Sequence, residues 1–508
     1  MRSQWREMDI RYYAIAASLL LSFYTALIKA TPNVDAFNYL RAAEIYLQDG
    51  IAAASAYYPW TAYPILIAEL HALSGMEMLN AAQIWNALFY ALLTWAFITI
   101  IQEFDKSRRL SIIAAACILL YPQLNEYRPY IIRDIGYLAF SLTALLQLIR
   151  LNRYQRLAHA LGFNVACATA ALFRPEAFAY LLLAPIALLF NTQIRLSRRL
   201  RALMTVYGMS LVLMAVAMLT SISVDIDPLQ KIAQGVSVYQ PFLNQAMVLL
   251  EGGSPELSAA IFHEHAAKFS GQYIIIFLLT GLFSILFIKL FTGFGWVYLL
   301  TVLYGVKQRL IRVPSHIAAP MIAYLLIASG ILLAFMFVTR FMTTRYTLLV
   351  ATVMVLLVPI IISRAAELAK QKSYLRTFNR MAGLLVIYLF IDATITFGES
   401  KRTERDAAEW VQERVQEWAQ ESHEKTQPLI TNSMLIAYRA GLPDYERTAD
   451  TIDRRLISDS TAGTRLAFTL RSSDRELMQQ YVDANVLELE RVFPTEGPAR
   501  VGIYRRLP

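Results

Sequence analysis

Long apolar runs alternate with short polar connections over the first four-fifths of the chain. Each run approaches the length that an α-helix needs to cross about 30 Å of hydrocarbon, where backbone groups must find their partners within the chain. The pattern therefore predicts an all-α polytopic membrane protein with about 11 to 13 transmembrane helices. The runs that we interpret as spans are 11–30, 82–101, 108–124, 135–150, 157–173, 176–191, 201–221, 272–292, 316–339, 346–363 and 381–397.

One stretch departs from the pattern of single spans. Segment 273–306 is too long for one crossing and too short for two with a loop, and Lys289 and Gly293 interrupt it. Two crossings would place the basic segment 307–309 outside, whereas basic loops are normally cytoplasmic. We therefore expect one crossing followed by an interfacial or kinked helix over 294–306.

The first connection, 31–81, is long and rich in aromatic residues. Pro32 ends the preceding helix because it has no N–H and disfavours helical geometry in the residue before it. The run 57–64, Tyr-Tyr-Pro-Trp-Thr-Ala-Tyr-Pro, has the composition of a membrane interface. Apolar residues recur at helical spacing in segments 36–49 and 64–75, which we expect to be amphipathic helices on the membrane surface.

The last part of the chain has a different composition. After Phe397 the charge rises sharply and the apolar residues follow a globular pattern. About 110 residues can bury a small core. We therefore predict a transmembrane domain over 1–397, with an outside cap loop at 222–271, and a small extracytoplasmic α/β domain over 398–508. The elements expected in this small domain are a helix over 407–418 and strands near 428–430, 486–492 and 500–504.

Composition agrees with a membrane protein and restricts its partners. Hydrophobic residues make up 57% of the chain and charged residues 17%, with a mean hydropathy of +0.43, which is more apolar than a soluble domain. The formal net charge of +9 indicates basic cytoplasmic loops and no nucleic-acid partner. The basic clusters that we assign to the cytoplasm are Arg2/Arg6, Lys106/Arg108/Arg109, Arg150/Arg153/Arg156, Arg195/Arg198/Arg199/Arg201, Lys307/Arg309/Arg312 and Arg364/Lys370/Lys372/Arg376/Arg380.

This orientation predicts a multi-pass protein of the plasma membrane, the inner membrane of a bacterium, with a periplasmic C-terminal domain. No small-residue cleavage site follows the first apolar run, so we interpret that run as a retained span. Cys117 and Cys167 lie inside apolar runs, and we expect two reduced thiols there. The connections assigned to the outside are 31–81, 125–134, 174–175, 222–271, 340–345 and everything after 397.

The unusual polar residues within or beside the spans all fall on the predicted outside face. Placing an ionisable group at membrane depth costs free energy, so such groups are functional candidates by default. Together they predict a basic pocket that also holds carboxylates, which suits an anionic lipid phosphate as leaving group and an acid–base group for an acceptor. The candidates are Asp35, then Arg128, Arg133 and Asp134, then the Arg174-Pro175-Glu176 turn, and finally Thr343-Thr344-Arg345-Tyr346.

Each candidate also has a purely structural interpretation. The acid of the first connection is suited to cap a helix N-terminus. Arginines at span ends anchor helices at lipid headgroups. Asp134 is placed to pair with Arg128 or Arg133, and Arg174 and Glu176 are placed to satisfy each other within a turn. The sequence leaves these alternatives open.

His263-Glu264-His265 is the remaining candidate for metal chemistry. Zinc-binding helices place two histidines at i and i+4, whereas here they stand at i and i+2 and would point in different directions from a helix. We therefore interpret the segment as a solvated part of the outside loop. We assign no metal ligands and no cofactor, and the sequence leaves the metal requirement open.

The order of these motifs resembles the GT-C class of integral-membrane glycosyltransferases, which use polyprenyl-phosphate-linked sugars. The similarity covers most of the chain and is to the branch with the bacterial protein O-mannosyltransferase-like enzymes and the lipid A aminoarabinose transferases. Members of that branch often carry a second acid where Ala36 follows Asp35 here. The motifs that carry the resemblance are Val34-Asp35-Ala36-Phe37-Asn38-Tyr39, Tyr57–Pro64, Arg133-Asp134, Arg345-Tyr346 and Asp406-Ala407-Ala408-Glu409-Trp410-Val411.

The resemblance implies an inverting transfer of a hexose or pentose from a polyprenyl-phosphate donor to an acceptor hydroxyl on the extracytoplasmic face. Asp35, the acid of the first outside loop, would be the general base. The expected partners are the donor, membrane lipid and an acceptor lipid, glycan or protein. The site residues that we assign are Asp35 and Asp134 for catalysis, Arg128, Arg133, Arg174 and Arg345 for the donor phosphate, and Tyr39, Tyr57, Tyr58, Glu176 and Tyr346 for substrate binding.

Two other functions remain open from the sequence. A transporter or flippase would bind an anionic lipid in the same pocket without chemistry, and internal inverted repeats would favour it. A lipid-linked oligosaccharide ligase or polymerase would use the same type of donor. A labelled donor separates the first alternative, because a flippase relocates the lipid without breaking the sugar–phosphate bond.

Overall fold

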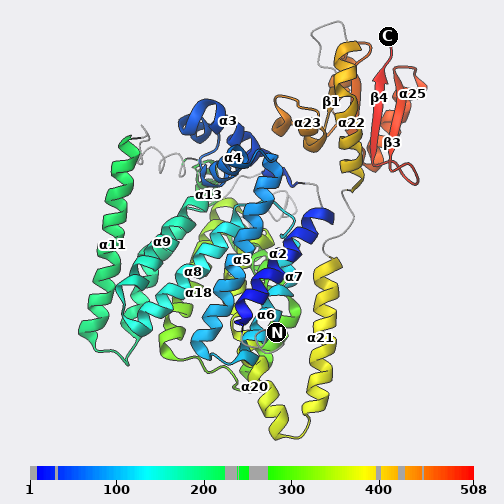
Figure 1. Cartoon of the computed structure of the whole chain (residues 1–508). Coiled ribbons are helices and arrows are strands. Elements are labelled where there is room, and N and C mark those ends of the chain that lie inside the picture. Colours follow the sequence, from blue (N-terminus) through cyan, green and yellow to red (C-terminus); the bar gives the residue numbers. More distant parts are fainter. Residues whose placement is uncertain are drawn as a thin grey trace.

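The computed structural model describes residues 8–28, 32–223, 237, 240–250, 273–395, 402–421, 429–448, 451–452 and 454–508. Figure 1 shows a bundle of long helices with a small sheet unit at one end. The helices of the bundle are α2 (Ile10–Ile28), α5 (Met78–Phe104), α6 (Arg108–Leu119), α7 (Pro122–Glu126), α8 (Asp134–Tyr154), α9 (Leu157–Phe173), α10 (Ala177–Leu183), η1 (Ala184–Phe190), α11 (Leu196–Ser223), α13 (Gln240–Leu250), α16 (Ile274–Phe294), α17 (Trp296–Lys307), α18 (Ser315–Thr339), α19 (Thr344–Val355), α20 (Leu357–Gln371) and α21 (Leu375–Ile395).

Seven helical stretches among the described residues are long and apolar enough to cross a membrane. They are α2, α5, α8, Leu196–Val216 of α11, α16, α18 and the stretch Thr344–Gln371 that α19 and α20 form together. Three shorter apolar helices are Leu157–Phe173, Ala177–Phe190 and Trp296–Lys307. The expected all-α polytopic architecture is confirmed, and the total of about 11 to 13 crossings stays a prediction.

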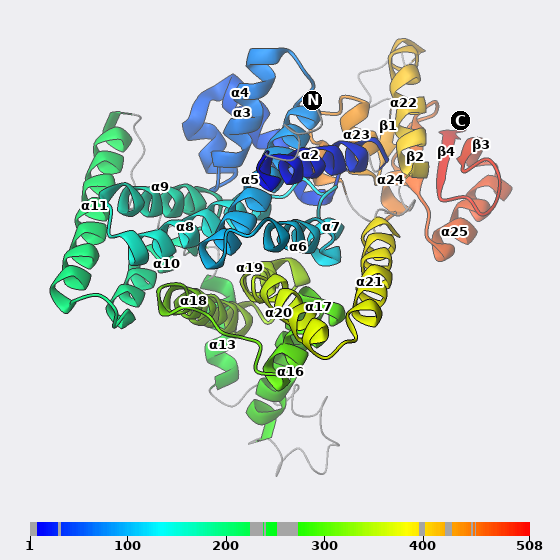
Figure 2. The same ribbon diagram turned by 60° about the horizontal axis from the view of Figure 1, so that its bottom comes forward.

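The bundle has a buried centre and an apolar rim. α5, α8 and the stretch Thr344–Gln371 are mostly enclosed, whereas α11 and α16 leave most of their side chains uncovered. Figure 2 shows α11 and α21 at opposite edges of the bundle. Apolar side chains at the rim fit a hydrocarbon environment, in which they need no cover from protein.

Residues that break helices divide the expected span 108–124 and the longer apolar segment 273–306. Span 108–124 becomes α6 and α7, because Pro122 starts a new helix, where its missing N–H costs nothing. Segment 273–306 is broken at Gly295, whose φ of +78° separates α16 from α17. The expected kinked helix over 294–306 is thus confirmed.

Gly293 lets α16 approach α19 closely. A Cβ at this position would overlap Thr347 Oγ1 of α19, and the Gly293 carbonyl accepts a hydrogen bond from the Tyr121 hydroxyl. Small residues at such crossings allow the dispersion contacts that hold helices together in lipid. The crossing also fixes the part of α19 that follows its first turn.

Replacing Gly293 by alanine should therefore separate α16 from α19. We expect Gly293→Ala to destabilise the protein by about 1–3 kcal/mol, as overpacking does, and to lower its thermal unfolding midpoint in detergent. The matched control is Gly281→Ala in the same helix, where an added Cβ meets nothing within 4 Å. Equal midpoints for the two variants would contradict the close-contact explanation.

Two helices of the first connection lie at the end of the bundle that carries the sheet unit (Figure 1). They are α3 (Val34–Tyr57) and α4 (Ala62–Ser74). The first is longer than the expected segment 36–49, because the helix resumes after a bend at Gly50, where φ is +82°. The connection between α20 and α21, one of the basic clusters, lies at the opposite end. The predicted outside cap loop over 222–271 falls mostly outside the described residues.

The C-terminal unit is a small sheet covered by helices. The strand order is β1-β2-β4-β3, with β1 parallel to β2 and the other pairs antiparallel. The expected helix over 407–418 lies within α22, and three of the four strands were expected. β2 was not, because this interior strand is buried along most of its length and has no alternation of apolar and polar residues. The elements are α22 (Arg402–Glu421), β1 (Leu429–Thr431), α23 (Met434–Arg439), η3 (Tyr445–Arg447), α24 (Arg454–Ser458), β2 (Arg465–Thr469), α25 (Ser472–Asp483), β3 (Leu487–Phe493) and β4 (Val501–Arg506).

Candidate active site

Asp35 lies in the first turn of α3, at the end of the bundle. The helix begins at Val34, and Asn33 occupies the N-cap position, so the alternative that Asp35 is the cap is wrong. The Asn33 amide oxygen instead accepts a hydrogen bond from the Ile131 N–H at 2.8 Å. This bond ties the start of α3 to the segment before α8. An acid in the first turn is favourable because the helix N-terminus carries partial positive charge.

Arg345 reaches Asp35 from the far end of the sequence. It lies in the first turn of α19, and its Nη1 is 2.5 Å from Asp35 Oδ2, across a separation of 310 positions. The Asp35 side chain is 39% exposed, so one of its faces is open. The buried Nε of Arg345 has no hydrogen-bond partner among the described residues. The pair therefore combines an accessible carboxylate with a guanidinium that has a donor to spare.

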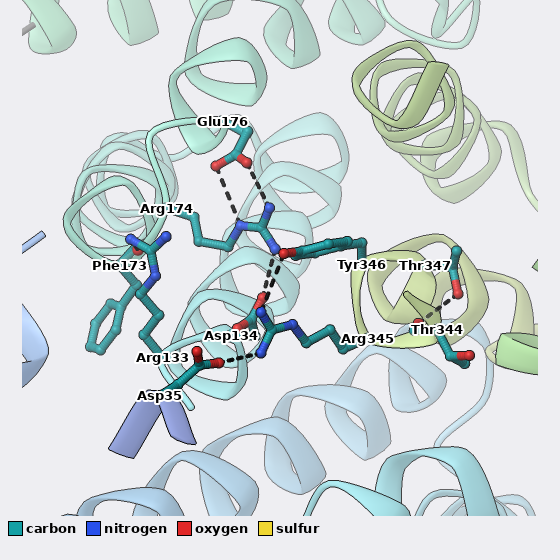
Figure 3. A network of polar contacts seen from close by, with 10 residues as sticks. All are labelled: Asp35, Arg133, Asp134, Phe173, Arg174, Glu176, Thr344, Arg345, Tyr346 and Thr347. Carbon is teal, nitrogen blue, oxygen red and sulfur yellow. Dashed lines mark hydrogen bonds and ion pairs between the residues drawn. The ribbon is translucent and has the colours of Figure 1, made fainter. Parts of the chain in front are cut away.

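A second ion-pair group lies beside the first (Figure 3). Arg174 Nη1 contacts Asp134 Oδ1 at 2.6 Å, and Arg174 Nη2 contacts Glu176 Oε1 at 2.6 Å. The exposed fractions are 12% for Arg174, 9% for Asp134 and 19% for Glu176. The expected pairing of Arg174 with Glu176 within the turn is confirmed, whereas Asp134 pairs with Arg174 and not with Arg128 or Arg133.

Tyr346 joins the two groups. Its ring centroid is 4.8 Å from the guanidinium carbon of Arg174 and 5.1 Å from that of Arg345, and its hydroxyl accepts a hydrogen bond from Arg345 Nη2 at 3.2 Å. Figure 3 shows the ring between the two arginines. An aromatic face attracts a cation, so Tyr346 holds the two guanidiniums near each other despite their like charge.

Arg133 is the third cation of the site. Its Nη1 donates to the Phe173 carbonyl at 2.9 Å, and its guanidinium lies 4.2 Å from the Trp60 ring centroid and 5.9 Å from that of Tyr58. Among the described residues, no carboxylate lies within ion-pairing distance of it. The sequence reasoning missed Trp60 as a site residue, although its place in the aromatic run was the available signal.

The charges of this site balance. Three carboxylates (Asp35, Asp134 and Glu176) face three guanidiniums (Arg133, Arg174 and Arg345), so the formal sum is zero. The sequence predicted a basic pocket, whereas the group that the structure brings together is formally neutral, because Arg128 does not join it and three acids match the three remaining arginines. An anion that binds the Nη1 side of Arg345 in such a site competes with the carboxylate of Asp35.

Arg128 is placed elsewhere. Its guanidinium donates to Ser18 and Ser22 of α2 and to Asn125 Oδ1, and it lies 4.1 Å from the Tyr90 ring centroid. It is buried, and its bonds tie α2 to the bundle. The structure does not bring this predicted phosphate ligand to the site of Asp35.

Of the predicted substrate-binding tyrosines, Tyr39 and Tyr57 belong to α3 itself, and Tyr58 follows directly after it. Tyr39 is buried, with ring centroids 5.5 Å from Tyr58 and 5.3 Å from Tyr63. The Tyr57 hydroxyl donates to Asn38 Oδ1 at 3.3 Å, and burial raises the pKa of Tyr57 to about 12. Tyr57 therefore stays protonated near neutral pH. These contacts hold α3 in place, and the half-buried Tyr58 has its ring centroid 5.9 Å from the Arg133 guanidinium.

Among the described residues, no candidate for metal or redox chemistry joins the site. His263-Glu264-His265 lies outside the described residues. Within the part of the chain that the structure describes, no three His, Cys, Asp or Glu side chains are arranged to hold a metal ion. Cys117 and Cys167 are buried, free thiols.

Comparisons with known proteins find similarity in structure but not in sequence. No protein-family model matches the sequence, and no curated protein matches it. The structure is similar to ArnT from Cupriavidus metallidurans in the apo state, with a TM-score of 0.50, 14% identity and 97% of each chain covered. It is similar to the same protein bound to undecaprenyl phosphate, with a TM-score of 0.50, 12% identity and 97% of each chain covered.

A third structure aligns less closely. It is the archaeal oligosaccharyltransferase AglB from Archaeoglobus fulgidus in complex with an inhibitory peptide and a dolichol-phosphate. The TM-score is 0.45 and the identity 13%, with 82% of this chain and 60% of that chain covered. The ArnT comparisons together with the apolar helices establish a multi-pass membrane protein with an ArnT-like fold, which is the GT-C fold that its motifs predicted.

Proposed function

We propose that the protein is a membrane glycosyltransferase that moves a sugar from a polyprenyl-phosphate donor to an acceptor hydroxyl on the extracytoplasmic face. The observation that carries this proposal is the contact between Asp35 and Arg345. It pairs an accessible carboxylate, able to take a proton, with a guanidinium able to bind a phosphate. The ArnT-like fold supports it, because one structure with that fold has undecaprenyl phosphate bound.

Asp35 is the general base in this proposal. Its carboxylate is 39% exposed, against 9% for Asp134 and 19% for Glu176, so it is the acid most open to an acceptor. Asp35 removes the hydroxyl proton as the acceptor oxygen bonds to the anomeric carbon. The bond from that carbon to the phosphate oxygen breaks, and the polyprenyl phosphate leaves with the electron pair. One displacement of this kind inverts the anomeric centre.

The arginines would stabilise the leaving phosphate. Arg345 has the unpartnered Nε, and Arg174 lies across the Tyr346 ring from it. Fixed cations aimed at developing negative charge act strongly in a partly dry site. Asp134 would orient Arg174, to which it is bonded, rather than react. Arg133 on Trp60 completes the cationic side.

Donor binding at Arg345 would be an exchange of partners, because Arg345 already contacts Asp35. The donor phosphate would draw Arg345 away from Asp35, because the Asp35–Arg345 ion pair is more exposed than the two ion pairs of Arg174. That exchange would free the carboxylate for the acceptor proton only when donor is present. The proposed base, Asp35, and the proposed phosphate ligand, Arg345, are then partners in one ion pair. Binding of the donor phosphate to Arg345 releases Asp35 to accept a proton.

This exchange predicts a change in the affinity of the protein for polyprenyl phosphate, which can be measured without an assay of turnover. Asp35→Asn should bind a polyprenyl phosphate about tenfold more tightly than the wild type, because the amide no longer competes for Arg345. Titration of the purified variants with that lipid in detergent measures it.

The control is a double-mutant cycle. In an Arg345→Ala background, Asp35→Asn should leave the affinity unchanged. An equal gain in both backgrounds would mean that Asp35 simply repels the phosphate, and the exchange would be refuted.

Activity itself is tested with labelled donor. Purified protein in liposomes, given a polyprenyl phosphate that carries a labelled sugar, should place the label on an acceptor extracted from the same membranes. If intact donor moves between leaflets without cleavage of the sugar–phosphate bond, the protein is a lipid transporter and this proposal is wrong. Mass analysis of glycans and lipids from cells with and without the chain would then identify the sugar and the acceptor.

A further inference from the structure

The first turn of α3 is held from two sides. Asp35 and Phe37 are two positions apart, so they project from nearly opposite sides of the helix. Asp35 contacts Arg345 of the bundle. Phe37 is buried, and its ring centroid lies 5.9 Å from Tyr438 and 6.2 Å from Tyr445 of the C-terminal unit. The proposed base thus belongs to a helix clamped between two parts of the protein.

The aromatic contact is a compact triangle. Tyr438 and Tyr445 are themselves 5.1 Å apart in a T-shaped arrangement, and they come from α23 and η3. Offset and edge-on aromatic pairs add to the free energy that their buried area supplies. Three rings that contact one another define the position of the helix more narrowly than one contact would.

Polar contacts surround the triangle. Arg439 Nη1 lies 3.1 Å from Glu77 Oε1, and the Tyr438 hydroxyl donates to the same oxygen at 3.4 Å. Arg41 of α3 lies 3.9 Å from Glu446 Oε1, whose side chain is almost fully buried. The C-terminal unit therefore contacts both α3 and the residue that precedes α5.

The start of α3 is also attached to the bundle and to α4. The Asn33–Ile131 hydrogen bond and the Asp35–Arg345 pair tie it to the bundle directly, and Tyr39 seats it on Tyr63 of α4. When a donor phosphate takes Arg345, one of these is lost. The contacts to the C-terminal unit do not depend on Arg345, so they persist through that exchange.

We propose that the C-terminal unit is a positioning element of the active site, in which Phe37, Tyr438 and Tyr445 hold Asp35 over the donor. The inference rests on the proposed function and adds to it a role for a unit that is remote in sequence. The three aromatic residues touch no reacting atom. They act through α3, and a shift of about 1 Å in a reacting group is enough to reduce turnover about 100-fold.

Variants of the full-length protein test the proposal. Phe37→Ala and Tyr445→Ala should lower kcat by about 10- to 100-fold, with the acceptor KM unchanged. Tyr445→Phe keeps the ring and should retain the wild-type kcat. The matched control is Tyr481→Ala, a half-buried aromatic of α25 that packs within the sheet unit, and it should leave kcat unchanged.

A second measurement does not depend on turnover. Hydrogen exchange should be faster at the amides of residues 36–40 in Tyr445→Ala than in Tyr481→Ala. A raised acceptor KM with an unchanged kcat would overturn the proposal and assign the unit to acceptor binding. Wild-type activity and wild-type exchange in Tyr445→Ala would also overturn it. A wild-type protein that transfers no sugar would refute the proposed function, and the exchange rates would then decide alone whether the unit holds α3.

Discussion

Asp35→Asn should reduce the turnover of the purified protein by a factor of about 10² to 10⁴, which is the usual effect of removing a positioned general base. The amide is nearly the same size as the carboxylate, but it cannot take the acceptor proton. Because the Asp35 side chain is 39% exposed, losing its ion pair should leave folding and expression intact. Initial rates with labelled donor and saturating acceptor measure the effect.

The control for this substitution lies on the same helix. Asp49 of α3 is exposed, and Asp49→Asn should transfer sugar at the wild-type rate. A normal rate for Asp35→Asn would show that the base is another group. Asp134 and Glu176 would be poor replacements, since both are bonded to Arg174 and are mostly enclosed.

Arg174→Ala should have the largest effect on stability. It leaves Asp134 and Glu176 without their shared partner at 9% and 19% exposure. Removing one partner from a buried charged group costs about 3–5 kcal/mol. We expect a strongly lowered thermal unfolding midpoint in detergent and a low yield of folded protein.

Two further variants separate charge from shape. Arg345→Ala removes the other paired arginine, but its acid is exposed, so the loss should be about 1 kcal/mol or less. Arg174→Met combined with Asp134→Asn and Glu176→Gln removes all three charges together and should recover most of the stability. A wild-type midpoint for Arg174→Ala would mean that the group is not structural and that Arg174 is free to serve the donor.

The expected effects of Arg174→Ala and Arg345→Ala differ, so the two arginines have different roles although both lie beside apolar runs in the sequence. Arg174 is enclosed between two acids, so its first role is to neutralise them and to fix the turn between α9 and α10. Arg345 has one exposed acid and an unpartnered Nε, so it has capacity for a ligand. The proposed phosphate site therefore depends first on Arg345, with Arg174 as support.

The sequence by itself determined the class of the protein and the residues worth considering. Apolar runs of spanning length predicted a polytopic helical protein, because hydrocarbon leaves few other ways to satisfy a backbone. Pro32 and the following amphipathic segment predicted a surface helix beginning near Asp35, and Gly293 marked a break that the structure has at Gly295. Asp35 and Arg345 became candidates because each is a charged residue next to an apolar run. Local hydropathy alone is enough to identify such positions.

The tertiary structure decided which charges meet. Arg128 and Arg133 are five positions apart, yet one binds serines of α2 and the other stacks on Trp60. Asp134 pairs with Arg174 rather than with its neighbours in sequence. The neutral sum of the site and the contact of α3 with the C-terminal unit were likewise not predicted. The physical reason is that hydropathy and periodicity report how each segment meets solvent or lipid, whereas the partner of a guanidinium depends on how separate helices pack.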